Sequence, residues 1–303
     1  ASFQEKNLFM DLTRTMTIQD GRSATFPVIG NATAKWHTAG ESVITDQDAD
    51  GPTDYSSKIK HTEKEIFIDD PLVSPILIPD IDRFMNHYDY RGVYVDKVSH
   101  SLTKAADEHI LATLLAASKA SEAITGETGR PTVAVNAGFA TTAATLIGGI
   151  FDAAAAFDSV DVPEDQRFVA LRPADYYALA QVKDLVERDS TGFGQDFGKG
   201  EILKIAGMTL VKTNNMPTTD LSAVADGGSR NDVFGGAGIG YNGNWTNVVA
   251  LCFHSDAVGT VKLADLALEE DRQVDRLAHL IVASYAMGHG VLRPEAAIHL
   301  SKA

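Results

Sequence analysis

Three acidic residues at alternate positions are the sharpest candidate for chemistry in this sequence. Asp46, Asp48 and Asp50 place carboxylate oxygens at positions one, three and five of a calcium-binding loop, and Gly51 supplies the glycine of position six. The bidentate Glu due at position twelve is replaced by Ser57, and the flanking segments resemble strands instead of helices. We interpret the segment as a solvated turn, and a calcium-dependent binding module remains the alternative from another class of function.

A glycine motif near residue 240 has the spacing of a dinucleotide-binding turn. Residues 238–243 read Gly-Ile-Gly-Tyr-Asn-Gly, which fits GxGxxG. Such a motif binds a pyrophosphate where it follows a strand and opens a helix, because the helix N-terminus supplies free N–H groups. Here a glycine-rich stretch precedes the motif, and a strand-like run, residues 244–249, follows it. We therefore expect no nucleotide cofactor.

The other residue types that do chemistry are scattered. The nine histidines include no HExxH pair, and no GxSxG elbow occurs. The single cysteine, Cys252, lies in an apolar run, where burial would raise the thiol pKa and make the group inert. We therefore assign no catalytic, cofactor-binding or metal-ligating residue and predict that the protein is not an enzyme. Packed or hydrogen-bonded imidazoles are expected at His61, His87, His100, His109, His254 and His289.

The composition is typical of a folded, acidic protein. The 303 residues are 44% hydrophobic and 22% charged, which is enough for roughly two packed domains. With 26 Lys and Arg against 41 Asp and Glu, the formal charge of -15 opposes general nucleic-acid binding. The most apolar stretch, residues 140–157, contains two glycines and an aspartate, so we expect no membrane anchor. The first residues lack the features of a signal peptide, and we expect no export by that route.

The N-terminal third predicts appendages that have little core of their own. Residues 1–20 show no sustained period, so we expect an extended arm that needs partners outside its own core. Residues 23–36 and 61–68 favour strands and flank a stretch rich in Gly, Asp and Ser, which predicts a long hairpin with a polar tip. Because both strands are poor in apolar residues, we expect the hairpin to lie on a neighbouring subunit.

The remaining chain predicts a mixed α+β body. Apolar residues at helical spacing indicate a long amphipathic helix over residues 98–120. Residues 272–287 fit a helix or a strand, and the pattern leaves both open. Residues 86–89 and 285–290 combine aromatic, polar and glycine residues, and we interpret them as hydrogen-bonded turns at domain or subunit junctions. Further helices are predicted at residues 141–157 and 173–187, and further strands at residues 166–171, 201–212, 246–254 and 258–268.

Several blocks of sequence, in a fixed order, resemble the major capsid proteins of autographivirus-type podoviruses, which are short-tailed double-stranded-DNA bacteriophages. The resemblance spans about residues 20–303 and is densest toward the C-terminus. The blocks are residues 61–64 (His-Thr-Glu-Lys), 80–89, 258–269, 285–290 (Tyr-Ala-Met-Gly-His-Gly) and 292–297.

This resemblance implies the tailed-phage capsid fold, also called the Johnson fold, which is an α+β fold. Its parts are an N-terminal arm, an extended hairpin loop, a peripheral domain with a long spine helix, and an axial domain. Residues 272–287 would then be strand. The implied parts are the arm at residues 1–22, the extended hairpin loop at 23–70, the peripheral domain at 71–130 with its spine helix at 98–120, the axial domain at 131–255, peripheral return strands at 256–290 and an axial C-terminal strand at 291–303.

The same resemblance implies the function. Subunits are expected to assemble as pentamers and hexamers into an icosahedral head, to need a scaffolding protein and a portal protein, and to mature from a procapsid as DNA is packaged. The expected locations are the virion capsid and, during assembly, the host cytoplasm, with double-stranded DNA enclosed without sequence-specific binding. An encapsulin-type nanocompartment shell, which shares the fold, is the alternative within the structural class.

Overall fold

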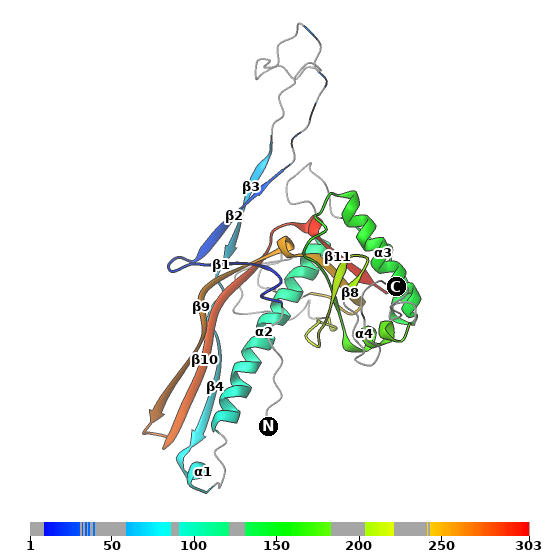
Figure 1. The fold of residues 1–303 in the computed structure, drawn as a ribbon. Coiled ribbons are helices and arrows are strands. Elements are labelled where there is room, and N and C mark those ends of the chain that lie inside the picture. Colours follow the sequence, from blue (N-terminus) through cyan, green and yellow to red (C-terminus); the bar gives the residue numbers. More distant parts are fainter. Residues whose placement is uncertain are drawn as a thin grey trace.

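The computed structural model describes most of the chain. The described residues are 9–30, 59–85, 91–120, 131–182, 204–220 and 243–302, with the single positions 32, 34, 36, 39 and 241. Figure 1 shows an elongated sheet with a long helix beside it, a second mixed region near the C-terminus, and a hairpin that projects from the body.

The elongated sheet, here called the long sheet, has four strands. Their order across the sheet is β1 (Arg14–Thr17), β9 (Val258–Gln273), β10 (Ala278–Val291) and β4 (Leu72–Pro79). β9 and β10 are antiparallel neighbours, and β1 runs parallel to the start of β9. The ambiguous residues 272–287 therefore form the end of β9, a turn and most of β10, so the strand alternative is confirmed.

The helix α2 (Arg91–Lys119) lies along one face of the long sheet (Figure 1). It begins before the predicted residue 98, because its first two turns are mostly exposed and carry no apolar period that would mark them in the sequence. Val98, Leu102 and Ala106 of α2 pack against Ala283, Tyr285 and Met287 of β10, and residues of β4 border the same cluster.

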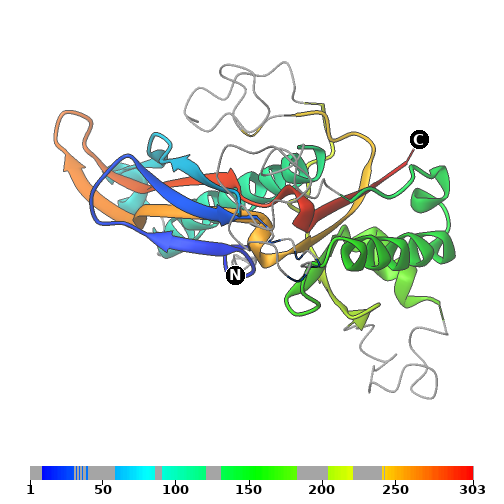
Figure 2. The same ribbon diagram turned by 90° about the horizontal axis from the view of Figure 1, so that it is seen from above.

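A second sheet of five strands lies at the other end of the molecule, beside the helix α3 (Ala143–Ser159), as Figure 2 shows. Its strand order is β11 (Ala297–Ser301), β8 (Val248–His254), β5 (Arg167–Leu171), β7 (Met208–Lys212) and β6 (Lys204–Ile205). The strands predicted over residues 166–171 and 246–254 are confirmed as β5 and β8, and the run 201–212 contains β6, a turn and β7.

Helices cover both faces of the five-stranded sheet, so successive side chains along a strand point into two different cores. Leu171 and Cys252 pack with α3 and α4 (Pro173–Ala180) on one face. Leu251 and Phe253 pack on the other face with the C-terminal half of α2. Every residue of β8 is buried, which explains its continuous apolar sequence. α4 ends earlier than the predicted residue 187, and α3 agrees with its prediction to within two residues.

Two short corners connect the sheets. β8 passes into β9 through the 3-10 turn η2 (Ser255–Ala257), and β10 passes into β11 through η3 (Pro294–Ala296). Leu292 and Arg293 donate their backbone N–H groups to the carbonyl of Ala257, so the corners are hydrogen-bonded to each other. The remaining short elements are η1 (Ala137–Ala140) before α3 and α1 (Asp80–Met85) after β4.

The hairpin consists of β2 (Ser23–Ile29) and β3 (His61–Phe67), which are antiparallel. We expected the hairpin to lie on a neighbouring subunit, but its base packs on the same chain. Phe26 and Ile66 contact Val261 of β9 within a small core. The reason is the alternation of β2, whose residues 24, 26 and 28 all face the body. The polar tip lies outside the described residues.

The described part of the arm also differs from its prediction, because it packs on the body of the same chain. Phe9 is fully buried among residues of α2 and the five-stranded sheet, and its backbone N–H donates to the Asp107 carboxylate at 3.4 Å. β1 then joins the edge of the long sheet. A single large aromatic side chain therefore fixes residues that have no periodic pattern.

Neither composition nor spacing predicts β4, and the turn predicted at residues 285–290 is wrong. β4 contains Pro75 and Pro79, which argue against a strand, but it lies at the edge of the long sheet, where a proline costs no interior hydrogen bond. Residues 285–290 are part of β10 and not a turn, and residues 86–89 lie outside the described part. No helix within the described ranges is both long and apolar enough to cross a membrane.

Candidate functional site at the arm and hairpin junction

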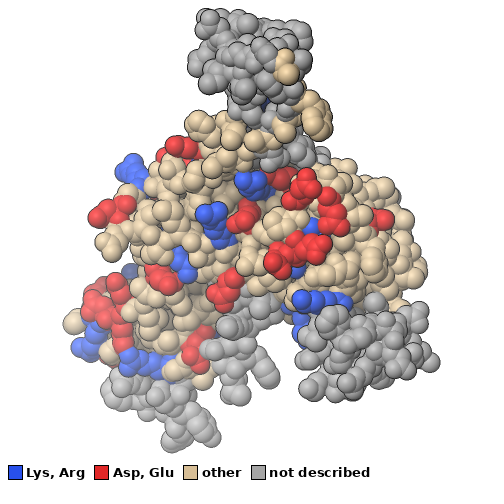
Figure 3. Space-filling view, turned by 45° about the horizontal axis from the view of Figure 1, so that its top comes forward, with Lys and Arg blue, Asp and Glu red and all other residues tan. Residues whose placement is uncertain are grey.

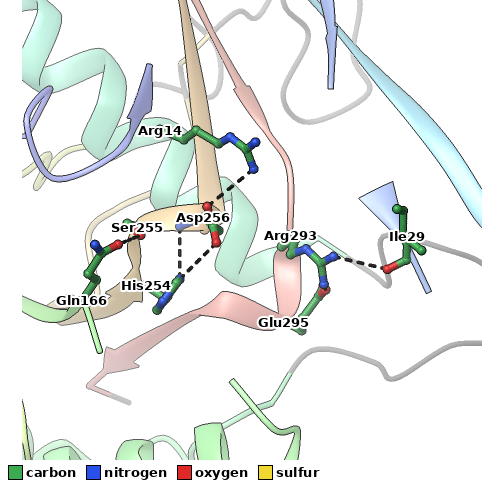
Figure 4. A network of polar contacts seen from close by, with 8 residues as sticks. All are labelled: Arg14, Ile29, Gln166, His254, Ser255, Asp256, Arg293 and Glu295. Carbon is green, nitrogen blue, oxygen red and sulfur yellow. Dashed lines mark hydrogen bonds and ion pairs between the residues drawn. The ribbon is translucent and has the colours of Figure 1, made fainter. Parts of the chain in front are cut away.

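A polar network lies where the arm, the hairpin and both sheets meet (Figure 4). It surrounds the two corners η2 and η3, so each appendage contacts the body beside the point where one sheet passes into the other. We call it the junction network. Its members are the side chains of Arg14, Gln166, His254, Ser255, Asp256, Arg293 and Glu295 and the backbone carbonyl of Ile29.

His254 organises the η2 corner. Its side chain is almost completely buried, and Nδ1 accepts a hydrogen bond from the Asp256 backbone N–H at 3.2 Å. Burial lowers the pKa of His254, and this outweighs the opposite effects of the Asp256 carboxylate and of a hydrogen bond to the Asp165 backbone. The imidazole is therefore neutral near pH 7 and acts as the acceptor that caps the corner.

The arm contacts this corner through Arg14. Its guanidinium lies 3.8 Å from the Asp256 carboxylate, and both side chains are about half exposed. Exposed pairs of this kind contribute about 0.2–1 kcal/mol. The same guanidinium lies 6.0 Å from the ring centroid of Phe26 in β2, so Arg14 contacts both the body and the hairpin.

The hairpin contacts the other corner through Arg293. One guanidinium nitrogen donates to the carbonyl of Ile29, the last residue of β2, at 3.2 Å. Another nitrogen lies 3.3 Å from the Glu295 carboxylate, which is mostly buried. Glu295 thus holds the arginine so that it points at the hairpin, as Figure 4 shows. A hydrogen bond from Ser255 to Gln166, 2.6 Å long, ties the η2 corner to the start of β5.

A second polar cluster is buried beside α2. His289 is 1% exposed, its Nδ1 lies 2.9 Å from the Thr260 hydroxyl, and its backbone N–H donates to the Tyr241 hydroxyl at 3.0 Å. Tyr241 donates to the Asp69 carboxylate and stacks on the ring of His109 with centroids 4.5 Å apart. Burial, with the neighbouring His109 and Lys262, lowers the pKa of His289 to about 3.

No sequence pattern predicts that these groups lie together. The expected packed or hydrogen-bonded imidazoles are confirmed for His109, His254 and His289. Nothing in the sequence indicates that His109 and His289, 180 positions apart, share one aromatic partner. Their only sequence signal is a histidine inside an otherwise apolar or small-residue segment. His87 lies outside the described residues.

The other candidates are placed as follows. Cys252 is fully buried, and burial raises its pKa to about 12, so the inert thiol is confirmed. A strand, β8, follows the GxGxxG motif, and of that motif only positions 241 and 243 are described. Asp46, Asp48 and Asp50 lie outside the described residues. Within the described part, no three His, Cys, Asp or Glu residues lie close enough together to hold a metal ion.

Charged side chains of both signs lie on the face drawn in Figure 3. The described acidic side chains gather in several places there, and the described basic ones form no continuous area over this face. This distribution fits contacts made by many individual pairs better than the binding of a polyanion.

The whole chain is similar to proteins of phage heads. A family model described as Gp10A-like major capsid protein matches residues 25–301. The major capsid protein of Escherichia phage T7 is 34% identical over 298 residues, covering 93% of this chain and 82% of the relative. The major capsid protein of Enterobacteria phage T3 is 33% identical over 318 residues, covering 98% and 86%.

Solved structures agree. A chain in the capsid structure of the Cyanophage P-SCSP1u has a TM-score of 0.81 and 33% identity, covering 100% of this chain and 90% of its own length. A chain from the mature capsid of bacteriophage PhiM1 has a TM-score of 0.72 at 15% identity, with 100% and 89% covered, which supports the fold. The predicted α+β capsid fold is therefore confirmed.

Proposed function

The chain belongs to the Gp10A-like family of major capsid proteins, and from this premise we propose how it builds the head of a short-tailed phage. It is a structural protein of the virion, not an enzyme, and it assembles with copies of itself. In our proposal the copies form pentamers and hexamers of an icosahedral shell. A scaffolding protein and a portal protein take part in the host cytoplasm, and the procapsid matures as double-stranded DNA is packaged.

We propose that the chain divides into the parts that its family implies. β9 and β10 pair with β4, which supports one peripheral unit formed from distant segments, and β11 pairs with β8, which supports the return of the C-terminus to the axial unit. The proposed parts are the arm at 1–22, the hairpin loop at 23–70, the peripheral domain at 71–130, the axial domain at 131–255, the return strands at 256–290 and the axial C-terminal strand at 291–303.

The observation that carries the proposal is the projecting hairpin (Figure 1). Beyond its packed base, the hairpin leaves the body and exposes apolar side chains to solvent, including Ile29, Ile59 and the almost fully exposed Trp36. Apolar surface that the chain cannot cover itself is stabilised by contact with another molecule. Since the protein assembles with itself, a neighbouring copy is the partner that we propose.

The far end of the long sheet offers a second contact between copies. Ile81, Met85, Val274 and Leu277 all expose most of their side chains there. Ion pairs connect β9 with α1 and α2 at this end: Arg272 lies 3.0 Å from the Asp80 carboxylate, and Arg91 at the start of α2 pairs with Glu270. Restraints of this kind reduce the entropy lost when the apolar side chains bind a neighbour.

The net charge of -15 supports a container that encloses DNA without gripping it. Acidic side chains that face packaged DNA would repel the phosphates, so DNA could move during packaging. No sequence-specific contact with DNA is part of the proposal.

The test is assembly itself. The wild-type chain is expressed alone and together with the scaffolding protein of the same phage, and the products are studied by size-exclusion chromatography and electron microscopy. We expect rings or closed shells, with closed shells favoured by the scaffolding protein. A chain that stays monomeric under both conditions would contradict the proposal. Cargo enzymes inside the shells, in place of DNA in phage particles, would indicate the nanocompartment alternative.

A further inference from the structure

The base of the hairpin packs on two glycines that lie side by side on neighbouring strands. Gly259 of β9 and Gly290 of β10 are direct register partners in the long sheet. The side chain of Ile66 in β3 packs onto both and is 1% exposed. We call this arrangement, Ile66 on the paired glycines, the glycine socket.

Neither glycine can be replaced without displacing a neighbour. A Cβ atom at Gly290 would lie 2.8 Å from Cγ1 and 3.1 Å from Cδ1 of Ile66, and its three nearest neighbouring atoms all belong to that side chain. A Cβ atom at Gly259 would lie 2.9 Å from Cδ1 of Leu292 and 3.0 Å from Cδ1 of Ile66. Glycine inside a strand normally weakens it, and it commonly marks a site where another segment approaches closely. Here the hairpin is that segment.

The glycines differ in how crowded they are. A Cβ atom at Gly92 in α2 or at Gly148 in α3 would meet nothing within 4 Å, whereas one at Gly149 would lie 2.6 Å from the Phe139 ring inside the body. The glycine socket differs from Gly149 because the crowding side chain, Ile66, belongs to an appendage. It sits beside the junction network, because Arg293 follows Leu292 directly and bonds the other strand of the hairpin at Ile29.

The two contacts restrain different strands. In the glycine socket, Ile66 of β3 packs on one face of the long sheet. Arg293 restrains the end of β2 through its hydrogen bond to Ile29. Ile66 also packs with Phe26 and Val261, so the socket limits how far β3 can shift across the sheet. The direction of the hairpin then depends on this packing together with the hydrogen bond from Arg293 to the end of β2.

We propose that the glycine socket and Arg293 together set the direction in which the hairpin leaves the body, and so determine where it meets the neighbouring copy. Their role is to position the hairpin for assembly. The inference rests on the proposed function, since the direction matters only if the hairpin binds another copy.

The direct test measures the direction of the hairpin in the unassembled chain. Spin labels are attached to cysteines introduced as Glu63→Cys in β3 and Lys97→Cys in α2, two exposed positions. Cys252 does not interfere, because it is fully buried. The distance between the labels is measured by double electron–electron resonance. We expect Gly290→Ala to shift this distance, while the control Gly92→Ala leaves it unchanged.

A double-variant series separates the socket from a general loss of structure. Ile66→Ala removes the three atoms that lie nearest to the new methyl group at position 290. In the Ile66→Ala background, Gly290→Ala should therefore cause no further shift. Gly259→Ala should still cause one, because it also meets Leu292. If Gly290→Ala alone fails to fold, a folded Gly290→Ala/Ile66→Ala variant with the distance of Ile66→Ala supports the proposal, and an unfolded one overturns it.

Assembly provides the second readout. With scaffolding protein present, we expect Gly290→Ala and Arg293→Gln to lose closed shells while the Gly92→Ala chain keeps them. An unchanged label distance in Gly290→Ala, or normal shells despite a shifted distance, overturns the proposal. Failure of the wild type to form shells would instead count against the proposed function, and the distance measurement on the unassembled chain would still test the socket.

Discussion

β8 and β3 are both seven-residue strands, but the chain surrounds them very differently. All seven residues of β8 are buried between helices on both sides of the five-stranded sheet. In β3 only Ile66 is buried, and the strand has a single partner, β2. The position of β8 is determined by many contacts at once, and that of β3 by very few.

This difference assigns separate tasks to the two regions. A strand inside a dense core keeps its place in every copy, which suits the constant part of a shell subunit. A hairpin held by one small core and a few polar contacts can change its position to bind a neighbour, and the folding stability of the body changes little. Substitutions in β8 should therefore change the stability of the subunit, and substitutions in the hairpin should change assembly.

The largest expected effect is a loss of folding stability, and it is tested by truncating one phenylalanine in each region. Phe253 in β8 is fully buried and packs near Phe9 and Phe168, with ring centroids 6.2 and 5.6 Å away. Phe253→Ala should lower the free energy of unfolding by about 3–5 kcal/mol, because it leaves a cavity. Phe67→Ala in the hairpin, where the side chain is 41% exposed, should lower it by about 1 kcal/mol or less.

Urea denaturation of the unassembled chain, followed by circular dichroism, measures both changes. Equal losses in the two variants would show that the hairpin belongs to the cooperative core of the body, as β8 does.

A pH experiment sharpens the comparison. Folding lowers the pKa of the buried His289 to about 3, so the folded state favours the neutral imidazole. A histidine with a lowered pKa contributes stability that is fully present above its unfolded pKa of about 6.5 and is lost as the pH falls toward 3. We expect His289 to contribute a slope of up to about 1.4 kcal/mol per pH unit in this window.

The matched variants are His289→Gln and Thr25→Ala, the latter at an exposed hairpin position that carries no titratable group. The first should reduce the loss of stability between pH 6.5 and 3, whereas the second should leave it unchanged. Urea midpoints across this pH range give the slopes. His254, whose pKa is also lowered, should keep part of the slope in both variants. Identical slopes in His289→Gln and the wild type would refute the role of His289.

A smaller effect on stability is expected at the boundary between the regions. Arg293→Gln removes the bond to Ile29 and leaves Glu295 without its partner. We expect a loss of about 0.5–1.5 kcal/mol in the unassembled chain, but a clear fall in the yield of closed shells. The control is Lys104→Gln, which also removes one positive charge, because the half-exposed Lys104 side chain on α2 lies 3.6 Å from the similarly exposed Glu108 carboxylate. Shell yields that fall equally in both variants would argue for a general effect of charge.

The regions also differ in how far the sequence predicted them. The apolar run of β8 and the helical period of α2 each lie within a single element. Local composition and spacing are therefore sufficient to predict the strand and the helix. The packing of Phe9, the edge position of β4 and the glycine socket depend on segments that are distant in sequence. No local pattern carries that information. Family resemblance supplied the strand for residues 272–287 where the pattern left two choices.

The junction network was unpredictable for the same reason. Arg14 and Asp256 are 242 positions apart, and Ile29 and Arg293 are 264 positions apart. Each residue type is common on protein surfaces, so nothing marks it in isolation. A contact of this kind becomes visible only when the fold has brought both corners to the base of the arm and hairpin.

The smallest expected effect concerns how the arm is held. Arg14→Ala removes an exposed pair with Asp256, and we expect a loss of about 0.2–1 kcal/mol at low salt that shrinks at high salt, since ions screen exposed charges. Limited proteolysis of the arm should therefore accelerate only slightly in Arg14→Ala. In Phe9→Ala it should accelerate strongly, because that substitution removes the fully buried anchor of the arm. If Arg14→Ala instead exposed the arm to protease as much as Phe9→Ala, the arm would be held by the polar junction and not by its aromatic anchor. The arm would then resemble the hairpin, whose position depends on few contacts, and would no longer count as part of the fixed body.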